Sequence, residues 1–216
     1  MGLHQCAAVA QHLLHFAAHV AAHSGIDAFV HAFESYLSLQ TNLITDAINL
    51  QAIELLASNI RPFVANRGNL EAGLNMLCGS ALAGMTFGQT GLGNVHCMAR
   101  FIGAQFHLSH GLSNALCLPH VARFNLVANP QKFARVAAAM GRPAQQWPTL
   151  DAAHAAVEAI QNMCLDLGIP PRLRDVGVTE DCFDEMAQLC TQANYNRWNP
   201  RHTTTADFRA LFEKAF

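Results

Sequence analysis

The sequence predicts an all-α protein, a single bundle of about eight or nine helices. Apolar residues recur every three or four positions in long segments that end at glycine or proline, the pattern of helices that bury one face. Strand signals are nearly absent, because there is no Asn-Gly hairpin turn and no sustained alternation of apolar and polar residues. With 216 residues, the chain is long enough for one domain with a full core.

The predicted helices follow one another with short connections. An Ala- and Leu-rich helix covers Cys6 to His23, and a second begins at Ser24-Gly25 and continues to about Leu39. The third begins at Thr45 and ends before Arg61-Pro62, since proline lacks the backbone donor that a helix interior needs. A further helix is bracketed by glycines within residues 91–111, and the others are expected at residues 70–87, 113–125, 130–140, 150–167, 179–194 and 205–216.

Composition and charge argue against several classes of protein. Only 13% of residues are charged, against about 25% in an average domain, so we expect part of the surface to be covered in a homodimer or by another domain. The formal net charge of -2, without a basic stripe, argues against nucleic-acid binding. Histidines interrupt each apolar run before it reaches about 18 residues, which argues against a transmembrane helix.

Cysteine usage and the N-terminal sequence predict a cytoplasmic protein. The seven cysteines are scattered and never form a Cys-x-x-Cys pair, so we expect small buried thiols in a reducing compartment rather than disulfides or a zinc ribbon. No Lys or Arg precedes Arg61, so the basic start of a signal peptide is absent.

A carboxylate and three histidines predict a metal site. Asp27 and His31 are four residues apart in a predicted helix, so both side chains lie on one helix face. His96 and His110 lie in the glycine-bracketed segment that also contains His107. One carboxylate with three imidazoles suits Zn(II) or Fe(II), whereas calcium and magnesium prefer more oxygen ligands.

A separate stripe of histidines precedes this set at helical spacing, at positions 12, 15, 19 and 23. We interpret it as the half-polar face of a surface helix, because no carboxylate or cysteine accompanies it. An accessory metal site or a pH-sensing face is the alternative.

Three spaced motifs carry a resemblance to a known family. They are Gly-Ile-Asp27-Ala-x-x-His31-Ala-x-Glu34, Leu92-Gly-x-x-His96-x-Met-Ala and Leu108-x-His110-Gly-x-x-Asn114-Ala-x-x-Leu-Pro119-His120. In this order they resemble the C-terminal half of the iron-dependent, or group III, alcohol dehydrogenases. The resemblance covers residues 24–216 and implies an all-helical metal-binding domain with an architecture like that of dehydroquinate synthase. Residues 1–23 form a non-family helix in this interpretation, and Asp27, His31, His96 and His110 match the family's metal ligands.

The resemblance implies the oxidation of an alcohol, or the reduction of an aldehyde or ketone, with NAD or NADP. Family members carry an N-terminal nucleotide-binding domain with a Gly-Gly-Gly-Ser phosphate loop, and this sequence contains neither. We therefore expect the chain alone to be inactive unless such a domain is supplied. The alternatives are a truncated, non-catalytic metal-binding module and a helical interaction protein without metal. The sequence identifies neither a catalytic residue nor a nucleotide-binding residue.

Four further residues are open to more than one interpretation. Arg100 stands where the family usually has a histidine; it cannot relay a proton, but it could hold an anionic substrate or pyrophosphate, or lie on the surface. Glu34 either orients a ligand histidine or lies on a solvated helix face. We expect His107 not to bind the metal and His120 to be a hydrogen-bonded structural histidine.

Overall fold

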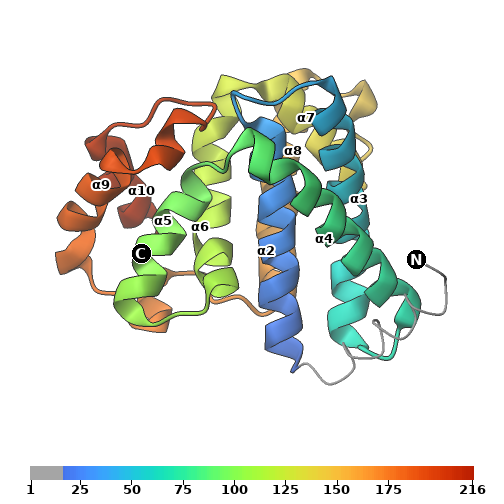
Figure 1. The fold of residues 1–216 in the computed structure, drawn as a ribbon, viewed down its shortest axis with the longest axis horizontal. Coiled ribbons are helices and arrows are strands. Elements are labelled where there is room, and N and C mark those ends of the chain that lie inside the picture. Colours follow the sequence, from blue (N-terminus) through green and yellow to red (C-terminus); the bar gives the residue numbers. More distant parts are fainter. Residues whose placement is uncertain (1–16) are drawn as a thin grey trace.

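The computed structural model describes residues 17–216, which form nine α-helices and no β-strand (Figure 1). The all-α prediction is confirmed. The helices are α2 (Ala18–Leu37), α3 (Leu43–Ala65), α4 (Leu70–Thr90), α5 (Asn94–Phe106), α6 (His110–Asn125), α7 (Pro130–Ala139), α8 (Thr149–Asp166), α9 (Phe183–Gln192) and α10 (Thr205–Ala215). Within the described part of the chain, no helix is both long and apolar enough to cross a membrane.

Helix α2 is the centre of the bundle. It packs against α3, α4 and α6, and Figure 1 shows it between the α3/α4 pair and the α5/α6 pair. Its large side chains Ile26, Phe29, Val30, Phe33 and Tyr36 are almost completely buried. A helix that is apolar on most sides belongs to a core. The same helix carries two of the four predicted donors, Asp27 and His31, which are therefore anchored in the core.

The start of this helix differs from the prediction. We expected one helix to end at His23 and another to begin at Ser24-Gly25, but α2 runs without interruption from Ala18. Gly25 lies inside the helix, where an added Cβ would be only 2.8 Å from Ile60 Cδ1 and 2.9 Å from Met76 Cε. The glycine therefore allows close helix packing and does not mark a helix start. The part of the first predicted helix that contains His12 and His15 lies outside the described residues.

The predicted stop at Arg61-Pro62 is also wrong. Helix α3 continues through Pro62 to Ala65, and the backbone N–H of Asn66 donates to the Pro62 carbonyl at 3.0 Å. Pro62 is exposed, and Phe63 in the same turn is buried. Packing of Phe63 thus outweighs the loss of one backbone donor near the end of the helix.

Other helix ends agree with the prediction to within a few residues, with two informative exceptions. Helix α6 begins at His110 rather than Ser113, so a predicted metal ligand occupies its first turn. The helix predicted at residues 179–194 is divided into a short 3₁₀ turn, Glu180–Cys182, and α9.

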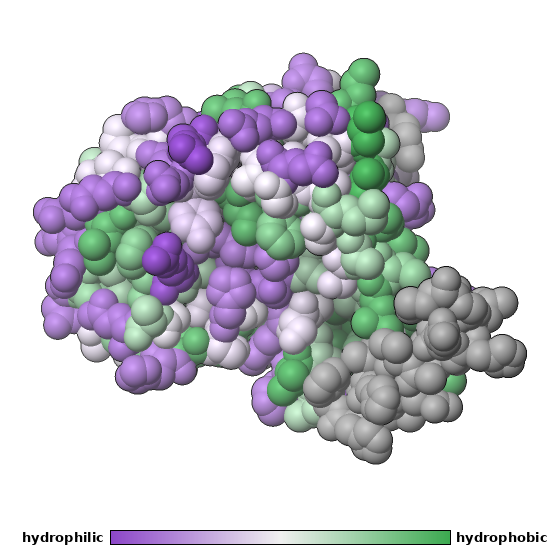
Figure 2. Space-filling model, in the orientation of Figure 1, coloured by the Kyte–Doolittle hydropathy of each residue, from purple (hydrophilic) through white to green (hydrophobic). Residues whose placement is uncertain are grey.

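Hydrophobic side chains are not spread evenly over the surface. Figure 2 shows them gathered toward the side of α3 and α4, whereas the side of α9 and α10 is mostly hydrophilic. The six described cysteines carry free thiols, and five of them are buried as expected. Cys78 differs, because it is exposed.

Candidate metal centre

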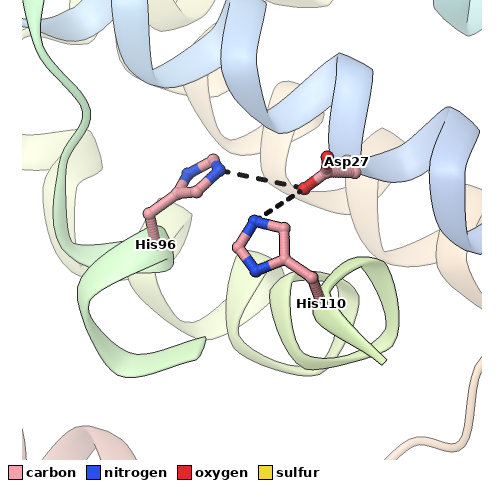
Figure 3. Close-up of side chains that lie close together, drawn as sticks. All are labelled: Asp27, His96 and His110. Atoms are coloured by element: carbon pink, nitrogen blue, oxygen red, sulfur yellow. Dashed lines mark ion pairs between the residues drawn. The ribbon is translucent and has the colours of Figure 1, made fainter. Parts of the chain in front are cut away.

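Three helices bring the predicted donor atoms to one place (Figure 3). Helix α2 supplies Asp27, the first turn of α5 supplies His96, and the first residue of α6 is His110. Asp27 Oδ1 lies 3.3 Å from His110 Nε2 and 3.8 Å from His96 Nε2. One donor atom from each of the three residues lies within 4.8 Å of the others, so this group could hold a metal ion.

His31 lies beside this group. Its Nε2 is 3.2 Å from His96 Nε2, and its Nδ1 is 3.7 Å from Asp27 Oδ2. Ligand atoms at about 2.1 Å from a tetrahedral ion lie about 3.4 Å apart. The separations among Asp27, His96 and His110 are near that value, so these three residues suit the nitrogen and oxygen coordination of one zinc or ferrous ion. His31 approaches His96 through Nε2 but Asp27 through Nδ1, and it does not belong to the group whose donor atoms lie within 4.8 Å of one another.

Glu34 orients His96 from the next turn of α2. The Glu34 side chain is buried, its Oε2 lies 2.7 Å from His96 Nδ1, and its Oε1 accepts a hydrogen bond from the Val95 backbone N–H at 2.6 Å. A carboxylate at Nδ1 favours the tautomer that leaves Nε2 free for a metal. The structure therefore contradicts the alternative in which Glu34 lies on a solvated helix face.

The start of α5 depends on this carboxylate. Gly93 precedes the helix and supplies no side-chain cap, so Glu34 accepts the Val95 N–H from 61 residues earlier, and Asn199 accepts the Asn94 N–H. An added Cβ at Gly93 would lie 3.0 Å from Glu34 Oε1 and 2.9 Å from Asn199 Oδ1. The glycine is needed because two polar side chains approach the backbone here.

Asn114 belongs to the third sequence motif, and its role in the centre is visible only in the structure. Its Nδ2 donates to Asp27 Oδ1 at 2.6 Å and lies 3.1 Å from His110 Nε2. Its position four residues after His110, one helical turn away, is the signal that could have identified it. The amide holds the carboxylate of α2 against the first turn of α6.

The centre is buried on one side and open on the other. The side chain of His96 is 3% exposed, and that of His110 is 55% exposed. Burial, followed by the neighbouring His96, lowers the pKa of His31, which keeps its imidazole neutral at pH 7. The ring of His31 stacks on Phe87 of α4, with ring centres 4.6 Å apart.

Phe87, which contacts His31 on one side, also lines a cavity of about 560 Å³. Arg100 also lines this cavity, together with Tyr195 and Trp198. Phe87 was not identified from the sequence, because its contact with His31 joins helices that are distant in the chain. Arg100 is exposed, which agrees both with a surface position and with contact to a bound anion.

His107 and His120, the other two histidines considered from the sequence, do not belong to the group. His107 is an exposed residue in left-handed conformation just after α5. His120 is half-buried on α6, where burial and the nearby Arg123 lower its pKa.

A sequence model described as the Fe-containing alcohol dehydrogenase family, C-terminal, matches residues 21–216. The 1,3-propanediol dehydrogenase of Klebsiella pneumoniae is 46% identical over 193 residues, which are 89% of this chain and 50% of that protein. Lactaldehyde reductase of Escherichia coli (strain K12) is 39% identical over the same shares of the two chains. The chain thus spans about half the length of these curated relatives.

Solved structures agree with the sequence relatives. The crystal structure of a 1,3-propanediol oxidoreductase superposes with a TM-score of 0.92 at 44% identity, over 94% of this chain and 53% of that chain. An alcohol dehydrogenase from Oenococcus oeni gives a TM-score of 0.91 at 38% identity, with the same coverage. The fold and the sequence therefore point to the same group of proteins.

Proposed function

Because this chain belongs to the Fe-containing alcohol dehydrogenase family, as its C-terminal helical part, we propose that it is the metal-binding half of an oxidoreductase. The reaction is the interconversion of an alcohol and an aldehyde or ketone with NAD or NADP. The observation that carries the proposal is the convergence of Asp27, His96 and His110 from three helices within 4.8 Å.

The proposed ligands are Asp27, His31, His96 and His110, and the ion is Fe(II) or Zn(II). When bound, such an ion acts as a Lewis acid toward an alcohol or carbonyl oxygen. The protein contributes rigid placement: α2 holds two donors one turn apart, and the Glu34 carboxylate fixes the ring of His96. The exposed side chain of His110 leaves the centre accessible from solvent.

The cavity beside Phe87 is the proposed substrate position. By their names, the relatives act on 1,3-propanediol and lactaldehyde, and a small substrate of this kind fits a space of about 560 Å³. Oxidation of the alcohol carbon transfers a hydride to the nicotinamide and releases the hydroxyl proton. Arg100, which stays protonated, cannot accept that proton, so we propose that it leaves to solvent.

The nicotinamide cofactor needs a nucleotide-binding domain beside this helical unit, and we propose that one is supplied on the same chain or by a partner. The matched relatives are about twice as long as the sequence aligned here, which supports this arrangement. The alternative function is a metal-binding helical module without hydride transfer.

Metal content tests the ligand assignment. The purified chain should contain about one iron or zinc ion, by elemental analysis, and a His96→Ala, His110→Ala double variant should contain none at that site. A matched variant with the exposed histidine of α8 replaced, His154→Gln, should retain the ion. Absence of metal in the unmodified chain after supply of iron or zinc would refute the proposed centre.

Turnover tests the proposed reaction. The nucleotide-binding half of the Klebsiella relative, joined before residue 21, should give NAD-dependent oxidation of 1,3-propanediol that the double variant lacks. Metal binding without turnover in a folded chimera that binds NAD would support the non-catalytic module instead.

A further inference from the structure

The histidine stripe continues into the candidate centre. His19, His23, Asp27 and His31 follow one another at intervals of four along α2 and therefore lie on one face of the helix. The proposed function uses only the last two. His19 and His23 line a cavity of about 370 Å³ whose wall also includes Asp27, Ser109 and His110. The unused pair thus lies at the outer end of a space that reaches the centre.

The two imidazoles are spaced for a shared ion. The ring centres of His19 and His23 are 5.8 Å apart, close to the 5.3 Å between His96 and His110 in the candidate centre. Two imidazoles on one ion, each with its nitrogen at about 2.1 Å, place their ring centres about 5 Å apart. A rotation of the exposed His19 side chain closes the remaining difference.

Ser109, the residue before α6, contacts the ring of His23. Ser109 Oγ lies 3.2 Å from His23 Nδ1, and in the tautomer whose Nδ1–H donates to this hydroxyl, Nε2 is left free for an ion. The backbone around His23 is also fixed, because an added Cβ at Gly111 would lie 2.3 Å from the His23 carbonyl oxygen. Helix α2 and the first turn of α6 therefore contact each other directly at this point.

We propose that His19 and His23 form a second site for a zinc-class divalent cation, at the outer end of the cavity that leads to the candidate centre. The protein supplies two imidazole nitrogens, and water completes the coordination. Two ligands bind more weakly than four, so this site fills only after the inner one. The inference does not depend on hydride transfer, since it concerns only the binding of the ion.

Zinc titration of the purified full chain tests the second site. Equilibrium dialysis against Zn(II), with elemental analysis, should show a second zinc ion per chain that binds more weakly than the first. His19→Gln and His23→Gln should each weaken that equivalent at least tenfold and leave the tighter one unchanged. Ser109→Ala should weaken it by a smaller factor, because the ring loses only its orienting contact.

Controls separate this site from other zinc-binding groups. Cys78→Ser and His154→Gln remove an exposed thiol and an exposed histidine elsewhere, and both should leave the second equivalent unchanged. The His96→Ala, His110→Ala variant should retain it. The proposal would be overturned if either His19→Gln or His23→Gln retained the weakly bound zinc ion. It would also be overturned if the unmodified chain bound only one zinc ion at saturation. Circular dichroism would confirm that the variants are folded.

Discussion

Glu34 and Asp207 each accept a hydrogen bond from a backbone N–H at the start of a helix, but their surroundings differ. Glu34 accepts the Val95 N–H at the start of α5 from 61 residues away and is buried. Asp207 accepts the Thr204 N–H at the start of α10 from three residues away, at the exposed surface. The first contact also holds a proposed metal ligand, and the second is only a local capping box. Helix capping by a carboxylate is therefore coupled to the candidate metal centre at Glu34 and independent of it at Asp207.

The largest effect is expected for Glu34→Gln. A neutral amide cannot accept from the backbone and from His96 Nδ1 at once, and its own N–H favours the tautomer that blocks Nε2. We expect metal affinity to fall more than tenfold, and the chain to lose about 2 kcal/mol of unfolding free energy. Metal titration and urea unfolding of the metal-free chain measure the two effects.

The two readouts distinguish positioning from simple destabilisation. Weaker binding in a variant that is fully folded at the working temperature assigns the loss to the orientation of His96. Unchanged metal affinity would contradict the role assigned to Glu34, even if stability fell.

Asn199 gives an intermediate case at the same end of α5. Its buried amide binds Asn94 N at 3.3 Å, Asn125 Nδ2 at 2.9 Å and the Arg201 carbonyl at 2.7 Å, without contact to a proposed ligand. Asn199→Ala leaves these groups unpaired and should cost about 1.5 kcal/mol in urea unfolding. Metal affinity should change by less than about threefold, since His96 keeps its carboxylate.

The half-buried Asn196 provides the matched control, because its amide binds a single carbonyl, that of Thr203. Asn196→Ala should cost less than Asn199→Ala. A loss of metal affinity in Asn199→Ala as large as that in Glu34→Gln would show that the centre depends on the whole end of α5 rather than on one carboxylate.

The contrast between local and distant contacts also explains what could be predicted from the sequence. The helical fold class followed from periodicity and was confirmed, and the four proposed ligands followed from spacing and family motifs. Glu34 could be placed near a histidine but not assigned to His96, because the contact joins α2 to α5. Phe87 and Asn114 acquire their positions only through helix packing. The errors at Gly25 and Pro62 have the same origin, since tertiary packing outweighed local signals for a helix start and a helix stop.

The smallest effect is expected for Asp207→Asn. Hydrogen bonds from the Thr204 side chain and backbone hold the pKa of Asp207 below its usual range. A carboxyl whose folded pKa is depressed contributes stability above its unfolded pKa of about 3.9 and loses it as pH falls through the folded value. The variant should therefore cost about 0.5 kcal/mol at pH 7 and progressively less below pH 4. Urea unfolding at pH 7 and pH 3 measures this, and metal affinity at pH 7 should not change. If the difference in unfolding free energy between the unmodified chain and Asp207→Asn were the same at both pH values, the negative charge of Asp207 would add nothing to the cap. Of the two capping carboxylates, only the buried Glu34 would then act through its charge.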